Sequence, residues 1–180
     1  MIFFFVYTHD RIQNGVKEET SLIAVRRNYV PPTDRRGAQV NIAGGQPLFK
    51  ELVMDEAYDT MFRRLFLEAH AEVVKVIPTR YLQTTPTDLT PVYHEFPDFH
   101  KDRDFLLFVD VGDNYPPQYR KSIDILIQRY LIDYICYRWF ETKSPEDAVT
   151  FFGRLEKTTQ DIVNLLNKRK GGIQRIPSFP

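Results

Sequence analysis

The chain has 180 residues, of which 43% are hydrophobic and 14% aromatic. This composition supplies enough apolar side chains for a folded core and excludes a wholly disordered protein. The 24 Lys and Arg residues balance the 24 Asp and Glu residues, which argues against a protein that coats duplex DNA through an overall positive field. A single cysteine excludes a disulfide framework and a multi-thiolate zinc site.

The opening of the chain carries no targeting signal that we can identify. Ile2–Tyr7 is too short for a secretory signal and has no basic region before it. No apolar run approaches the roughly 18 residues that span a bilayer. We therefore expect a soluble, cytosolic product with no membrane partner.

The N-terminal third favours extended structure. Ile2–Tyr7 is a β-rich aromatic run, and Ser21–Arg26 follows the turn signal Asn14-Gly15, so strands or a hairpin are predicted here. The segment from Asn28 to Lys50 is rich in proline and glycine, and it is too long for an ordinary connector in a compact domain. We interpret it as an extended arm.

Two helices are predicted in the middle of the chain. The first begins near Asp55, whose carboxylate can cap free amides, and it ends at Pro78, which cannot continue a helix. The second follows Pro116 and Pro117 and runs to about Glu141. Its apolar stripe is wide, so we expect it to be the central helix, covered on more than one side.

A third helix and one strand complete the predicted elements. Ser144 can cap the third helix, and Asp147 can reach back as in a capping box. Gly171-Gly172 ends this helix, and the short link before it makes the second and third helices antiparallel neighbours. Phe105–Val111 is predicted as a strand, and the proline-containing residues 78–104 as an irregular loop.

Together these patterns predict an α-dominated α+β fold. Its core is an antiparallel bundle of three or more helices, with a small sheet formed by the N-terminal run and Phe105–Val111. We divide the chain into an N-terminal strand and arm region (residues 1–50), a helical core (51–172) with the inserted loop 78–104, and an extended tail (173–180).

The candidates for catalysis each have a plainer structural explanation. Cys136 lies in an apolar stripe, where a free cysteine behaves as a small hydrophobe. Glu68 and Glu72 lie one turn apart, which is typical of a solvated helix face. The loop His94–Asp102 gathers possible metal ligands, but in a spacing that matches no metal motif. We therefore predict no enzyme, no cofactor and no metal, and we keep an enzyme built on that loop as a third hypothesis.

Aromatic and arginine side chains in the arms indicate protein contacts. Tyr, Phe and Arg are enriched in interfaces, whereas a merely flexible loop is more often built from Gly, Ser and charged residues. The tail alternates apolar and polar residues, as a strand does when one side meets a surface. The predicted partner-binding residues are Tyr29, Arg35, Arg36, Phe49, Ile173, Arg175, Ile176 and Phe179.

This layout resembles the small helical neck proteins of tailed bacteriophages, of the head-to-tail connector or adaptor type, particularly those of crAss-like phages. The similarity covers roughly Asp55 to Pro180. It is carried by Asp55-Glu56-Ala57-Tyr58 and Glu68-Ala69 in the first helix, by the run from Tyr130 to Phe140 in the second, and by a capped third helix closing in Arg169 before a basic tail.

The resemblance implies a non-catalytic virion protein of the neck or tail region, assembled in the host bacterial cytoplasm. Such proteins form rings of roughly twelve copies, their arms embrace neighbouring subunits, the portal protein or tail components, and DNA passes through the lumen. Ile2–Tyr7 and Ile173–Phe179 are suitable strand donors to neighbours. The alternative is a small nucleic-acid-binding or regulatory protein that uses Arg26-Arg27, Arg35-Arg36 and Lys168-Arg169-Lys170.

Overall fold

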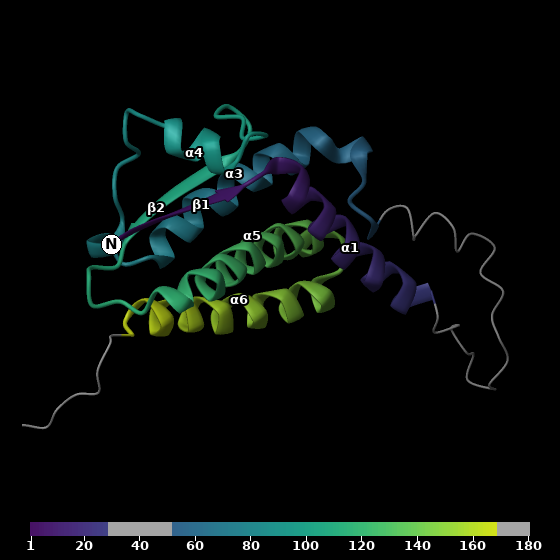
Figure 1. The fold of residues 1–180 in the computed structure, drawn as a ribbon. Helices are drawn as coiled ribbons and strands as arrows, with labels where there is room; N and C mark the ends of the chain where they lie inside the picture. The colour runs from purple at the N-terminus through teal and green to yellow at the C-terminus, as the bar shows by residue number, and fades with distance from the viewer. Residues whose placement is uncertain (29–51, 169–180) are drawn as a thin grey trace, which may run out of the picture.

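The computed structural model describes residues 1–28 and 52–168 (Figure 1). The predicted arm and the tail lie outside the described residues. The described part is mostly helical α+β, with four main helices and a small two-stranded antiparallel sheet. The elements are β1 (Ile2–Tyr7), α1 (His9–Asn28), α3 (Asp59–Val76), α4 (Thr90–Glu95), β2 (Phe105–Asp110), α5 (Arg120–Lys143) and α6 (Pro145–Leu166), with 3-10 turns at Glu56–Tyr58, Thr79–Tyr81 and Pro117–Tyr119.

The sheet pairs the N-terminal run with Phe105–Asp110, as predicted. The strands are antiparallel, with Phe4 opposite Phe108. Successive side chains point to opposite faces of a strand, and here both faces are covered. Phe3 and Phe5 enter the main core, whereas Val6 enters a second cluster beneath α4. Coverage on both faces explains why every residue of the run is apolar.

The prediction of a strand at Ser21–Arg26 is wrong, because this segment belongs to α1. The helix buries Ile12, Val16 and Ala24 at helical spacing, and this burial outweighs the local preference for strand and turn. Gly15 lies inside the helix. A Cβ there would come within 2.5 Å of Ile132 Cδ1, so glycine permits the close approach of α1 to α5.

The helix predicted to begin near Asp55 is confirmed. The Asp55 side chain accepts a hydrogen bond from the Ala57 amide in the 3-10 turn that precedes α3, and α3 ends at Val76, shortly before Pro78. The loop 78–104 is more ordered than predicted. It contains α4, and Leu82 forms a β-bridge with Val109 in β2.

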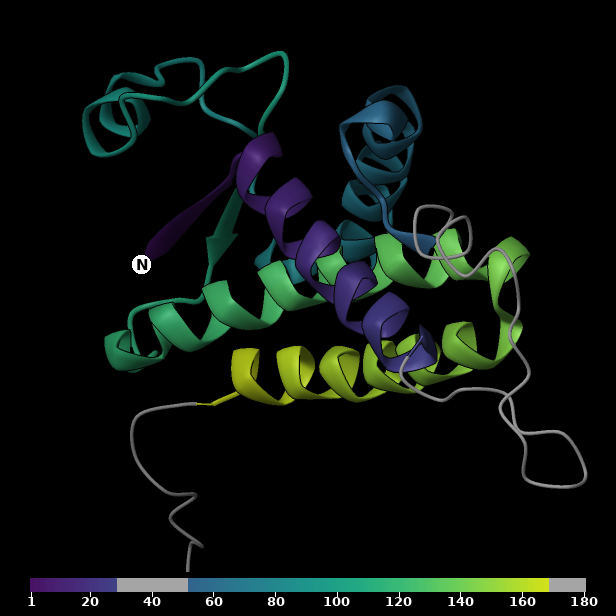
Figure 2. The same cartoon turned by 90° about the vertical axis from the view of Figure 1, so that its right-hand side faces the viewer.

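The central position predicted for the second helix is confirmed as well. α5 packs against α6, α3 and α1, and Figure 2 shows α1 lying across α5 toward α6. Leu131, Ile135 and Trp139 of α5 are fully buried. α5 and α6 lie side by side as antiparallel neighbours, because only Ser144 separates them.

The prediction that the Ser144 side chain caps α6 is wrong. Its carbonyl accepts hydrogen bonds from the Asp147 and Ala148 amides at 3.0 and 3.1 Å, but its hydroxyl makes no cap hydrogen bond. The hydroxyl donates to the Asp147 carboxylate and accepts from Arg27 of α1. Arg27 Nε also lies 2.6 Å from Asp147 Oδ2. Both residues of the expected capping box, Ser144 and Asp147, therefore bind Arg27 of α1 instead of the free amides of α6.

Leu131→Asp tests the central position of α5. Leu131 is fully buried, so the variant places an unpaired carboxylate in the core, which is expected to lower the free energy of unfolding by several kcal/mol or to force the acid to stay neutral. The matched control is Leu67→Asp, because Leu67 is 66% exposed on α3. Urea titrations that give equal losses for the two variants would contradict the burial of α5.

Candidate functional site

The partner-binding residues predicted from the sequence all lie outside the described residues. The structure therefore neither brings them together nor separates them, and their role stays a prediction. They are Tyr29, Arg35, Arg36, Phe49, Ile173, Arg175, Ile176 and Phe179.

The chemical candidates within the described part are placed as follows. Cys136 is fully buried, and burial raises the pKa of its thiol well above the ordinary value, so the reactive thiolate form is disfavoured. In the loop His94–Asp102, Glu95 pairs with Arg120 and the His100 amide donates to Asp104. Across residues 1–28 and 52–168, no group of three or more His, Cys, Asp or Glu side chains could hold a metal ion.

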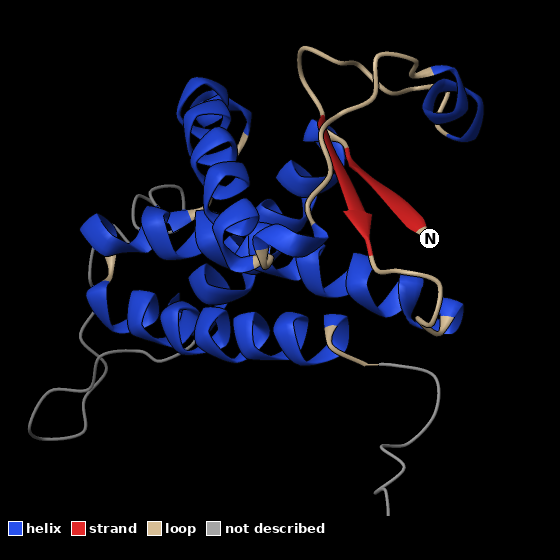
Figure 3. Cartoon of the chain, turned by 90° about the vertical axis from the view of Figure 1, so that its left-hand side faces the viewer, coloured by secondary structure: helices blue, strands red, loops and turns tan. Residues whose placement is uncertain are grey.

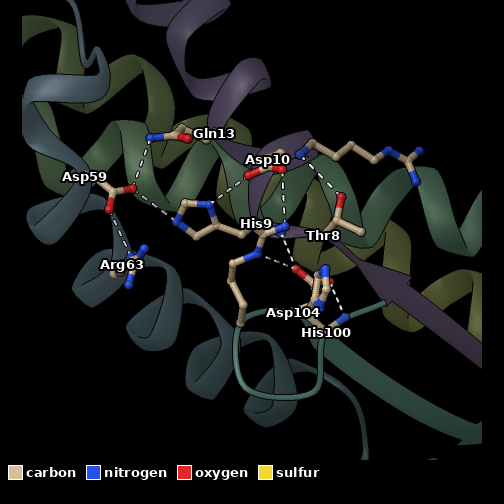
Figure 4. A network of polar contacts seen from close by, with 10 residues as sticks. Thr8, His9, Asp10, Gln13, Asp59, Arg63, His100 and Asp104 are labelled. Carbon is tan, nitrogen blue, oxygen red and sulfur yellow. Dashed lines mark hydrogen bonds and ion pairs between the residues drawn. The ribbon is translucent and has the colours of Figure 1, made fainter. Parts of the chain in front are cut away.

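A buried histidine that the sequence reasoning missed lies where β1 passes into α1 (Figure 4). His9 Nδ1 is 3.3 Å from Asp10 Oδ1, and its Nε2 is 3.5 Å from Asp59 Oδ1. The ring meets Phe62 edge-on, with 4.8 Å between the centroids. Asp59 is in turn held by Arg63, whose Nε lies 3.0 Å from Oδ2.

Asp104 completes this junction from the opposite side of the turn. Its carboxylate accepts hydrogen bonds from the His9 amide at 2.9 Å and from the His100 amide at 2.8 Å. It thereby ties the first turn of α1 to the loop that enters β2. His9 has both ring nitrogens directed at carboxylates, and the residue is only 3% exposed. The geometry holds three elements together: the first turn of α1, the start of α3 and the loop that enters β2.

A second buried polar group, Asp133, lies where α5 meets α1 and α6. Arg154 Nη1 is 3.6 Å from its Oδ1 and also lies 3.0 Å from Glu19 Oε2. Arg129 Nε is 3.8 Å from Oδ2, which has no hydrogen-bond partner among the described residues. Desolvation outweighs the two arginines and raises the pKa of Asp133 to about 6. The signal in the sequence that could have identified this group was an acidic residue, Asp133, in the largely apolar run from Tyr130 to Phe140.

A row of aromatic side chains runs along α5 from the core to the surface of α6. Tyr130, Tyr134, Tyr137 and Phe152 follow one another with centroid distances of 6.4, 6.5 and 5.7 Å. Phe152 is 47% exposed, and the tyrosines grade from buried Tyr130 to half-buried Tyr137. We call these four residues the aromatic row. Tyr and Phe presented together on rigid helices are typical of protein interfaces.

A second apolar surface lies on α1. Leu22 and Val25 are 64% and 51% exposed and line a shallow groove with Lys17 and Ser21. We call Leu22 and Val25 the α1 patch. α1 meets α5 near Ile132, which lies two residues and thus about 200° around the helix from Tyr134. The α1 patch and the aromatic row therefore lie on different sides of α5.

Comparisons of this chain with protein-family models, with curated proteins and with solved structures found no match. Among the described residues, no helix has both the length and the apolar character needed to cross a membrane.

Asp133→Asn tests the desolvation of this carboxylate through the pH dependence of the free energy of unfolding. Because the pKa of Asp133 in the native state, about 6, exceeds the unfolded value near 3.9, the native state binds the extra proton between these values. Stability from this group is present below about pH 4 and is lost as the pH rises through 6. The variant should therefore be more stable than the wild type at pH 8, by up to about 2 kcal/mol, and equal near pH 4.

The matched control is Asp98→Asn, at an exposed position, which should leave the pH dependence unchanged. Thermal unfolding across this pH range provides the measurement. A variant that is less stable than the wild type at pH 8 would show that pairing with Arg154 outweighs desolvation.

Proposed function

We propose that the protein is a structural subunit of the head-to-tail connector, or neck, of a tailed bacteriophage. Copies of it form a ring that surrounds the DNA channel and joins the portal to tail components. The observation that carries the proposal is the presence of two unlike apolar surfaces, the α1 patch on α1 and the aromatic row on α5 and α6, on different sides of the packed helices. The order of elements from Asp55 onward, which resembles such neck proteins, agrees with it.

Two unlike surfaces are what a ring requires. A head-to-tail contact joins one surface of a subunit to a different surface of the next, and it closes into a ring when the rotation between subunits closes. Burial of the exposed parts of Leu22 and Phe152, which are 64% and 47% exposed, would contribute roughly half of the about 1.5–3 kcal/mol that full burial of such a side chain gives, before the costs of association. We place the α1 patch of one subunit against the aromatic row of its neighbour.

The nucleic-acid-binding alternative receives less support from the described residues. Arg27, one of its expected phosphate contacts, is paired with Asp147 and lies 3.5 Å from Glu146. A guanidinium held by two carboxylates is a poor partner for phosphate. Arg35, Arg36 and Arg169 lie outside the described residues, so their part in this alternative stays a hypothesis.

Leu22→Glu and Phe152→Glu test the head-to-tail arrangement. Each variant alone should be a monomer, because one surface of every possible contact carries a buried charge. An equimolar mixture should form a heterodimer and nothing larger, because it retains one intact α1 patch and one intact aromatic row. Native mass spectrometry distinguishes the monomer of each variant, the heterodimer of the mixture and the ring of the wild type, for which roughly twelve copies are expected.

Leu67→Glu is the control for this experiment, because it adds the same charge at an exposed apolar position on α3. It should assemble as the wild type does. A wild-type chain that remains monomeric at all concentrations, with or without portal protein, contradicts the proposed function. A mixture that stays monomeric contradicts the pairing of these two surfaces.

Deletion of residues 173–180 tests the predicted role of the tail. Ile173, Ile176 and Phe179 should each contribute about 1.5–3 kcal/mol when docked on a neighbour, and Arg175 can add a charge-assisted hydrogen bond. The truncated protein should melt almost as the wild type does but fail to assemble. A truncated protein that still enters the full assembly contradicts this role, and one that melts early indicates a tail that folds back on its own helices.

A further inference from the structure

In the described part of the chain, the outer edge of β1 is the open edge of the sheet. The Val111 amide donates to the Met1 carbonyl at 3.1 Å, so Met1 faces β2. Because polar groups alternate along a strand, those of Ile2, Phe4 and Val6 point away from β2. The edge of β2 is occupied instead, since its Phe108 carbonyl accepts from the Gln83 amide at 3.1 Å.

A groove of about 210 Å³ runs along this open edge. Its floor is the stretch Phe4–Val6 of β1. One wall is the end of α4, with Glu95 and Phe96, and the other is the start of α5, with Arg120 and Lys121. Figure 3 shows β1 as the outer strand, with α4 and the start of α5 on either side of it. The groove thus continues the layering of the sheet, and a further strand would enter between the same two layers that cover β1.

Arg120 crosses the groove and closes it. Its Nη2 lies 3.0 Å from Glu95 Oε1 on the opposite wall and donates to the outward Phe4 carbonyl at 3.3 Å. The side chains of Arg120 and Glu95 are 41% and 44% exposed. Exposed ion pairs of this kind are weak, so a carboxylate of a bound segment can replace Glu95 as the partner of Arg120. No bond to the Phe4 or Val6 amide is made within residues 1–28 and 52–168.

The charged side chains that line the groove indicate what kind of segment it binds. Arg11 and Lys121 line it, are exposed, and form no ion pair with any described residue. Of its two carboxylates, Glu95 is held by Arg120 and Asp124 is half-buried, so the three cations of the lining, Arg11, Arg120 and Lys121, outnumber them. A second copy of β1 would bring the same cations with it. The tail of this chain carries no acidic residue to meet them.

We propose that the outer edge of β1 binds an extended, acidic segment of a partner protein, which adds to the sheet as a third strand. Main-chain hydrogen bonds to Phe4 and Val6 hold the segment. Arg11, Lys121 and the released Arg120 bind its carboxylates. This inference rests on the sheet edge and is independent of the proposed ring.

The test uses the full-length chain and a synthetic eight-residue peptide of alternating Val and Glu. Amide hydrogen exchange followed by NMR should show fast exchange at Phe4 and Val6 in the free protein, and slowing by about tenfold or more with peptide. A Val and Lys peptide of equal length, and a Val and Glu peptide N-methylated at every residue so that neither edge can pair, should give no protection. Protection by either of these, or none by the first peptide, overturns the proposal.

Charge variants complete the test by fluorescence anisotropy. Arg11→Glu with Lys121→Glu should weaken binding of the acidic peptide by about tenfold or more, whereas the control Lys157→Glu, exposed on α6, should not. Glu95→Gln should strengthen binding because it frees Arg120. Equal binding by the charge-reversed variant overturns the proposal, as does protection of Phe4 and Val6 without peptide at high protein concentration, which would identify a second copy as the occupant. Leu22→Glu should bind the peptide normally, which separates this site from the ring.

Discussion

Burial of α5 is the constraint on which the other helices depend. A helix covered by α1, α3 and α6 must be apolar around most of its circumference, and Leu131, Ile135 and Trp139 are fully buried in it. Trp139 keeps its indole N–H satisfied by donating to the Leu52 carbonyl at 2.7 Å, as a buried donor must. The elements that carry the proposed surfaces, α1, α6 and the strand β1, all pack against α5, which fixes their positions relative to one another.

Polar contacts between helices give this packing its orientation. Arg154 of α6 lies between Glu19 of α1 and Asp133 of α5, so one guanidinium links three helices. A buried ion pair is close to neutral in stability once desolvation is counted, and the raised pKa of Asp133 records that cost. We interpret the cluster as a device that selects one arrangement of α1 on the pair α5 and α6. Gly15 lets α1 approach α5 closely, beside Ile132.

The sequence predicted those elements whose signals are local. Apolar periodicity with Asp55 and Pro78 at its ends gave α3, and the aromatic run gave a strand whose partner was also foreseen. The wrong predictions concern segments whose structure is decided by contacts with residues far away in the sequence. Ser21–Arg26 is helical because α1 packs on α5, and Ser144 turns to Arg27, which lies 117 residues earlier in the chain. The surfaces were beyond sequence reasoning too, since Phe151 and Phe152 are equally apolar and only the position of α5 decides which one is exposed.

The pairing of β1 also decides what kind of strand exchange the protein can make. As a donor to a neighbour, Ile2–Tyr7 would have to leave β2 and expose Phe3, Phe5 and Tyr7, which are buried in its own core. Each of these large side chains contributes about 1.5–3 kcal/mol by burial, so donation would lose most of the stability of a typical domain. As an acceptor, β1 keeps all its bonds to β2 and gives up only the exposed contact of Arg120 with the Phe4 carbonyl and Glu95. The physical expectation is therefore that β1 receives a strand, and that any arm given to a neighbour comes from another part of the chain.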